Sequence, residues 1–212
     1  MKIVCFGESP ADQAAMAVFI EGILGEPSEI IDMGLEGNGV TGVLNALSGV
    51  FRGVYFNSDA QGLVVVVDSD DSELHHPDHD KPEGRREDCR LYQARKIIIL
   101  ASKKMRARQG RPGLNVAIGL AVPAIEAWYL VGKEHQVGEA AWRIGLVAAK
   151  PPFTRSKLKE LVYGTDRPSL EHETECAVKE ARRVIADMNA LESAFPAGFG
   201  SMASIIRSWK AT

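Results

Sequence analysis

The chain has 212 residues, of which 45% are hydrophobic and 25% are charged. These values are close to the averages of globular proteins, so they exclude wholesale disorder and suit one domain or a domain with a helical appendage. The net charge of −3 does not indicate a polyanion partner for the chain as a whole. No apolar stretch reaches the roughly 18 residues that a membrane helix needs, so we expect no membrane contact.

Cysteine usage and the first residues bear on the compartment. The three cysteines, at positions 5, 89 and 176, are widely spaced and form no CxxC motif. We therefore expect no disulfide framework and a cytoplasmic location. The first thirteen residues lack the long apolar segment of a secretion signal, so we also expect no signal peptide.

The pattern of apolar residues predicts alternating strands and helices in the first 131 residues. The run Leu63–Val67 is typical of a strand that is buried on both faces of a parallel sheet. Ser9 and Pro10 suit the start of the first helix, and Gly25 suits its end. The predicted elements are strand 2–7, helix 11–24, strand 29–33, helix 41–51, strand 63–67, loop 72–84, helix 86–108, strand 114–121 and helix 123–131. This alternation predicts an α/β fold in which helices cover both faces of a mostly parallel sheet.

After Gly132 the pattern predicts helices only. The expected helices span 136–148, 154–163, 171–194 and 199–209. We therefore expect an α/β core of residues 1–132 and a helical extension of residues 133–212 that packs on it.

Acidic residues follow several of the predicted strands, at the edge of a parallel sheet where ligands bind. Glu8 and Asp12 follow the first strand, Asp68 and Asp70 follow the third, and Glu126 follows the fourth. Carboxylates that converge at one edge repel each other, and a divalent cation such as Mg²⁺ or Mn²⁺ resolves that conflict. The alternative is an ordinary polar turn at 68–71 and, at Glu8, an acid that complements the helix dipole.

Three of these segments resemble a known family. The segments are CFGESPAD at 5–12, VVVVDSD at 64–70 and VPAIEAWYL at 122–130. They resemble the Toprim domain of topoisomerases, primases and OLD-type nucleases, and the third looks like the EAW segment of a small bacterial Toprim-like branch associated with phage defence. Segments 156–159 and 195–201 also resemble that branch. GESP stands where the family usually has Glu-Gly, which keeps Glu8 but loosens the expected turn.

The resemblance implies a Toprim-like core and phosphoryl-transfer chemistry on nucleic acid, DNA or RNA. Asp68 and Asp70 would bind Mg²⁺, and Glu8 would bind metal or act as a general acid or base. Asp12 and Glu126 look like the additional ligands with which OLD-type nucleases hold a second ion. We therefore expect a Mg²⁺-dependent nuclease or a nuclease subunit, in which Glu8, Asp68 and Asp70 are catalytic.

Partners and alternatives complete this hypothesis. Small proteins of this branch commonly work with an ATPase, and the chain has no GxxxxGK[ST] loop, so ATP hydrolysis would require a separate subunit. A homo-oligomer is also compatible with the sequence. The alternatives are a non-catalytic Toprim-like module that binds nucleic acid or protein, and a hydrolase that acts on nucleotides.

Basic residues are concentrated after the third strand. Positions 81–111 hold eleven Lys or Arg against three Asp or Glu. This excess suits contact with a phosphate backbone, with Arg85, Arg86, Arg90 and, further on, Lys159 as candidates. A solvated helix face is the alternative.

Histidines cluster in the loop between the third strand and the next helix. His75, His76 and His79 lie near two aspartates and not far from Cys89. Their spacing matches no zinc signature, and the loop directly follows Asp70. We therefore favour a mobile, substrate-facing loop over a zinc site.

Overall fold

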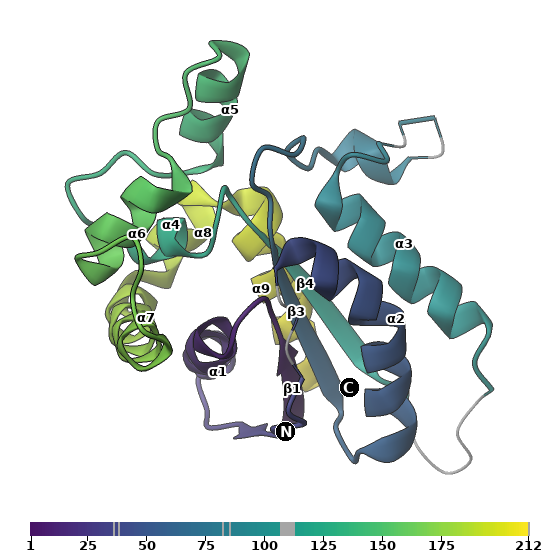
Figure 1. The fold of residues 1–212 in the computed structure, drawn as a ribbon. Coiled ribbons are helices and arrows are strands. Elements are labelled where there is room, and N and C mark those ends of the chain that lie inside the picture. Colours follow the sequence, from purple (N-terminus) through teal and green to yellow (C-terminus); the bar gives the residue numbers. More distant parts are fainter. Residues whose placement is uncertain (36, 38, 82, 85, 107–112, 212) are drawn as a thin grey trace.

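The computed structural model describes residues 1–212 except 36, 38, 82, 85, 107–112 and 212 (Figure 1). Its elements, in chain order, are β1 (Lys2–Phe6), α1 (Pro10–Leu24), β2 (Glu29–Ile30), α2 (Val40–Asn57), β3 (Gly62–Asp68), the 3-10 turn η1 (Pro77–Asp80), α3 (Arg90–Lys103), β4 (Asn115–Ala121), α4 (Glu126–Tyr129), α5 (Glu139–Val147), α6 (Arg155–Tyr163), α7 (Leu170–Val184), the 3-10 turn η2 (Ile185–Asp187), α8 (Met188–Ala194), the π-helical turn η3 (Pro196–Gly200), α9 (Ser201–Ser208) and the 3-10 turn η4 (Trp209–Ala211).

The sheet has four parallel strands in the order β2-β1-β3-β4. Every residue of β3 is buried, because strands flank it on both sides and helices cover both faces. The prediction of an α/β fold with a parallel sheet and a C-terminal helical stretch is confirmed. Strand β2 is shorter than predicted, because only Glu29 and Ile30 pair with β1.

Helices cover both faces of the sheet (Figure 1). Helices α2 and α3 pack together on one face, whereas α1 and α9 pack on the other. Helix α7 lies outside α1 and packs along it.

One apolar core joins the sheet to the C-terminal helices. The ring of Phe199 in η3 meets Phe19 of α1 with centroids 5.4 Å apart, and Trp128 of α4 at 5.1 Å. The helical extension therefore packs on the α/β core through aromatic contacts. The boundary at residue 132 stays a prediction.

Local sequence signals explain where α1 begins and ends. The Ser9 hydroxyl accepts a hydrogen bond from the backbone N–H of Asp12, and the Asp12 carboxylate accepts one from the N–H of Ser9. Gly25 ends the helix in the left-handed conformation, with φ of 65°. The predicted start and end of this helix are confirmed.

Several predicted helices differ from the structure, and the predicted helix 41–51 continues to Asn57. The predicted helix 123–131 forms only the single turn α4, because residues 122–125 bend to approach the end of β3. The predicted helix 86–108 begins at Arg90, after Cys89 at its N-cap, and ends at Lys103, while the predicted residues 107 and 108 lie outside the described residues. The predicted helix 171–194 is divided at Asp187, whose carboxylate caps α8.

Among the described residues, no helix combines the length and apolar character required to cross a bilayer.

Candidate functional site

The topology of the sheet has a reversal point between β1 and β3. The chain leaves β1 toward one edge of the sheet and leaves β3 toward the other, because β2 and β4 lie on opposite sides of this pair. Ligands of open parallel sheets bind at such a reversal point, at the carboxyl ends of the strands. Glu8 lies two residues beyond β1, and Asp68 is the last residue of β3.

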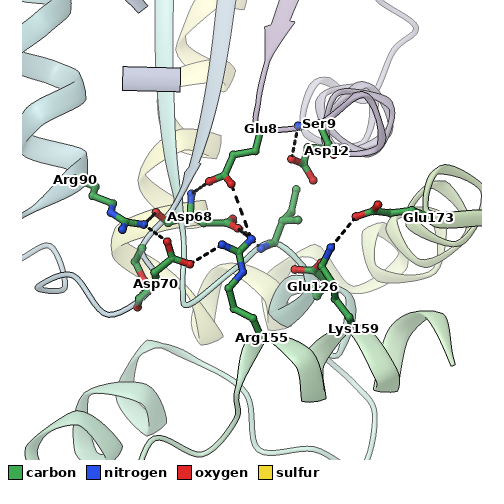
Figure 2. Close-up of polar contacts among 12 residues, drawn as sticks. Glu8, Ser9, Asp12, Asp68, Asp70, Arg90, Glu126, Arg155, Lys159 and Glu173 are labelled. Atoms are coloured by element: carbon green, nitrogen blue, oxygen red, sulfur yellow. Dashed lines mark hydrogen bonds and ion pairs between the residues drawn. The ribbon is translucent and has the colours of Figure 1, made fainter. Parts of the chain in front are cut away.

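Glu8, Asp68 and Asp70 meet at this point (Figure 2). Oε1 of Glu8 accepts a hydrogen bond from the backbone N–H of Asp68 at 3.2 Å. Oδ1 of Asp68 accepts one from the backbone N–H of Ile125 at 3.1 Å. Backbone groups thus fix both carboxylates, and the prediction that strand ends bring them together agrees with the geometry.

Asp70 has an uncommon backbone conformation, with φ of 42°. Aspartate tolerates this left-handed region better than most residues do. The backbone N–H of Asp70 donates to the carbonyl of Pro123 at 2.8 Å, which ties the turn after β3 to the segment after β4. This turn directs the Asp70 side chain toward the same space as that of Asp68 (Figure 2).

Arg155 bridges the three carboxylates (Figure 2). Its Nη2 lies 2.6 Å from Oδ2 of Asp68, and its Nη1 lies 2.6 Å from Oδ1 of Asp70. The same Nη2 lies 3.9 Å from Oε2 of Glu8. A guanidinium from the helical extension thus neutralises part of the charge that the sheet gathers.

The sequence analysis missed Arg155, although a weak signal exists. Arg155 is the first residue of α6, where the helix dipole disfavours a positive charge. Thr154 caps the same helix, so the helix start is recognisable from the sequence. An arginine at that position indicates a negative partner elsewhere in the fold.

The predicted nucleic-acid-binding residues have separate environments. Nη1 of Arg90 donates to the Asp68 carbonyl at 2.7 Å and to Oδ2 of Asp70 at 2.6 Å. Arg86 is exposed, with Nε 3.7 Å from Glu73. Arg85 lies outside the described residues. Arg90 is thus part of the carboxylate site, and nucleic-acid binding by these residues stays a prediction.

A second acidic group lies beside the first. Glu126 is 3% exposed, and its Oε1 accepts a hydrogen bond from the Tyr163 hydroxyl at 3.4 Å. Nζ of Lys159 lies 3.9 Å from that oxygen and 3.3 Å from Oε1 of Glu173. Glu173, on α7, is an acidic member that the sequence analysis did not identify.

Burial and mutual repulsion raise the pKa values of four carboxyl groups in the site. Burial is the largest cause for each of Glu8, Asp12, Asp68 and Glu126. The pKa of Asp12 is raised to about 7, first by burial and then by the charges of Glu126 and Glu8. The pKa of Asp68 is raised well above its normal value by burial and then by Glu8 and Glu126, while Arg155 opposes the shift. Glu8 and Glu126 thus act on both Asp12 and Asp68, and Arg155 links Asp70 to Glu8 and Asp68. Asp12 also takes part in the cap of α1.

The donor set fits Mg²⁺ or Mn²⁺. All the candidate ligands are carboxylate oxygens, which hard divalent cations prefer. Burial raises the pKa values of Asp68 and Glu126 even though Arg155 opposes the shift at both groups and Lys159 opposes it at Glu126. Nearby, the buried Tyr129 hydroxyl has no hydrogen-bond partner among the described residues. A bound cation would stabilise the ionised carboxylates, and one of its water ligands would provide a hydrogen-bond partner for the Tyr129 hydroxyl.

Comparison of the chain with protein-family models, with curated proteins and with solved structures gives no match. The fold and the chemistry of this site therefore carry the functional conclusion.

The histidine loop differs from the prediction of a substrate-facing segment. His75 and His79 are each 6% exposed, and Cys89 is fully buried. His76 remains exposed. Two of the three histidines thus point inward, and His75 contacts Cys89 and Arg95 at the start of α3.

Proposed function

We propose that the chain is a Mg²⁺- or Mn²⁺-dependent phosphodiester hydrolase of Toprim type that acts on nucleic acid, alone or as a nuclease subunit. The observation that carries the proposal is the convergence of Glu8, Asp68 and Asp70 at the reversal point of a parallel sheet. The resemblance to Toprim segments supports it. A cytoplasmic location, a homo-oligomer, an ATPase partner and a role in phage defence belong to the same proposal and stay predictions.

Glu8, Asp68 and Asp70 would hold the first cation, and Asp12 and Glu126 a second one. When bound, such cations stabilise the negative charge that develops on a phosphate undergoing hydrolysis. Burial raises the pKa of Glu8, which suits a group that accepts and returns a proton during hydrolysis. The backbone N–H of Asp68 donates a hydrogen bond to the Glu8 carboxylate and so fixes its position for this role.

Cationic side chains at the site's edge would bind the substrate. Arg155 presents two guanidinium nitrogens in a fork, a geometry that suits a phosphate as well as two carboxylates. A cation bound by Asp68 and Asp70 would compete with Arg155 for them and release the guanidinium toward phosphate oxygens. Lys159 would add a further positive charge beside Glu126.

One observation favours the non-catalytic alternative. Arg155 and Arg90 already pair with both oxygens of Asp70, and Arg155 also pairs with Asp68. An ion-pair network of this kind can lock a fold without any cation. In that case the same surface would serve as a binding module.

Cleavage and cation binding test the proposal together. Plasmid DNA, single-stranded DNA and single-stranded RNA are incubated with wild type and with Asp68→Asn/Asp70→Asn, in Mg²⁺ or Mn²⁺. Calorimetry measures Mn²⁺ binding to the same two proteins. Asp71→Asn is the matched control, because Asp71 is an exposed carboxylate next to the site.

Cation-dependent cleavage that the double variant loses and the control keeps supports the nuclease. Mn²⁺ binding without cleavage by wild type indicates that a partner chain or a nucleotide substrate is required. Absence of both cleavage and Mn²⁺ binding overturns the proposal and leaves the binding module.

A further inference from the structure

A second group of potential ligands lies in the loop between β3 and α3. We name His75, His79 and Cys89 the His–Cys cluster. All three side chains are buried, and one ligand atom from each lies within 4.8 Å of the other two. The cluster is separate from the carboxylate site in chemistry, because it offers nitrogen and sulfur rather than oxygen.

The distance between two cluster atoms agrees with a shared tetrahedral metal. Sγ of Cys89 lies 3.5 Å from Nδ1 of His75. In a tetrahedral zinc site, Zn–S of about 2.3 Å and Zn–N of about 2.0–2.1 Å place the sulfur and nitrogen atoms roughly 3.5 Å apart. The pair thus already has the spacing of two adjacent zinc ligands.

Carboxylates face the outer nitrogens of both histidines. Nε2 of His75 lies 3.3 Å from Oδ2 of Asp80, which Arg95 also binds at 2.6 Å. Nε2 of His79 lies 3.7 Å from Oε1 of Glu73. Zinc-bound histidines have such partners, which fix the ring orientation. For His75 this leaves Nδ1, the atom beside Sγ of Cys89, for the metal. Nδ1 of His79 accepts a hydrogen bond from the backbone N–H of His76 at 3.3 Å, and it would give up that bond to bind the metal.

We propose that the His–Cys cluster binds one zinc ion. Thiolate and imidazole donors select zinc over the hard cations that suit the carboxylate site. With three protein ligands, the fourth position is left for water or for a further ligand. A groove of about 520 Å³, lined by His79 and Glu73 among other residues, lies beside the cluster and gives room for that ligand.

The zinc would hold together the two ends of the loop that connects Asp70 to Arg90, two residues of the carboxylate site. The loop begins directly after Asp70 and ends at Cys89, the residue before Arg90. Arg90 binds Asp70 and the Asp68 carbonyl. A zinc ion on His75, His79 and Cys89 would therefore fix the position of Arg90, whether or not the carboxylate site is catalytic.

Metal analysis and cobalt spectroscopy test the proposal. The full chain is stripped with a chelator, reloaded with Zn²⁺ or Co²⁺ and desalted, and metal content is measured by mass spectrometry. We expect one equivalent of zinc per chain. We also expect a thiolate-to-cobalt charge-transfer band in the wild type that Cys89→Ser abolishes.

The chain contains a matched control for this experiment. Cys176 lies 3.7 Å from Nε2 of His172, so it also forms a Cys–His pair, but among the described residues no third ligand completes a cluster there. Cys176→Ser should keep the full zinc content and the cobalt band. Asp80→Asn should weaken zinc binding by about 10- to 100-fold, because it removes the partner of His75 Nε2.

Failure of the reloaded wild type to retain zinc or to show the cobalt band overturns the proposal, whatever the variants do. A band that survives Cys89→Ser and disappears with Cys176→Ser also overturns it. If Cys89→Ser does not fold, His79→Gln and Asp80→Asn provide the same comparison without changing the buried thiol. None of these measurements depends on cleavage, so failure of the proposed function leaves the zinc result intact.

Discussion

The His–Cys cluster lies in the loop that begins directly after Asp70 of the carboxylate site, but the two groups differ in how they are assembled. The carboxylate site draws Glu8, Asp68, Glu126 and Arg155 from segments far apart in the sequence. The His–Cys cluster takes its three residues from positions 75 to 89. Its donors are soft nitrogen and sulfur, whereas those of the carboxylate site are hard oxygens. Long-range folding thus builds a highly charged site, while a local loop builds a compact ligand cluster.

Substitution of one ligand residue in each site should have the largest effect and should show that the two sites bind metal independently. Asp68→Asn should weaken Mn²⁺ binding by about 100-fold, because it replaces a charged ligand oxygen with a neutral amide oxygen, and should leave the cobalt band unchanged. Cys89→Ser should do the reverse. Calorimetry with Mn²⁺ and absorption with Co²⁺ measure the two effects on the same preparations. Loss of both signals in either variant would show that the regions are one coupled site.

Removal of the Arg155 guanidinium should increase the affinity of the carboxylate site for a divalent cation. Arg155→Met removes the positive charge that competes with a metal for Asp68 and Asp70, so Mn²⁺ should bind about tenfold tighter. Arg167→Met is the control, because Arg167 is an exposed arginine in the loop between α6 and α7. Calorimetry measures the change. Unchanged or weaker Mn²⁺ binding in Arg155→Met would mean that the guanidinium does not occupy the cation's place.

The raised pKa of Asp12 should make the free energy of unfolding depend on pH. Because the pKa of Asp12 is raised to about 7, the folded protein keeps a proton that the unfolded chain releases at lower pH. Stability from this group is therefore present at low pH and is lost as pH rises from about 4 to 7. Without divalent cations, the free energy of unfolding should fall by about 2 kcal/mol between pH 5 and 8 on account of Asp12.

Asp12→Asn should reduce that pH dependence while keeping an oxygen that can cap α1. Urea unfolding at pH 5 and at pH 8, in the presence of a chelator, measures it. Mg²⁺ should restore stability at pH 8 in the wild type. Equal pH dependence in the two proteins would show that Asp12 does not share the charge of the site.

The smallest effect concerns the cap of α1. Ser9→Ala removes the hydroxyl that accepts from the Asp12 N–H and should lower the free energy of unfolding by about 1 kcal/mol. The loss should be the same at pH 5 and at pH 8, because serine does not titrate there. A pH-dependent loss would mean that Ser9 acts on the charge of Asp12 rather than as a cap alone.

Local patterns predicted much of the fold because they express local physics. Ser9, Pro10 and Gly25 mark the ends of α1, and the apolar run at Leu63–Val67 lies inside β3. The prediction of a helix at 123–131 was wrong in length, because contacts with the end of β3 bend the chain before Glu126. The tertiary contact between the Ile125 N–H and Asp68 prevailed over helix propensity.

The sequence by itself determined the parallel sheet, the acidic strand ends and hence the place of a charged site. These features depend on periodicity and on the rule that the carboxyl ends of parallel strands share an edge. Only the tertiary structure decided that Arg155 enters that site, that Glu173 joins it, and that His75, His79 and Cys89 turn inward together. These contacts depend on how the helical extension and the loop pack against the sheet, and residue spacing along the chain does not specify that packing.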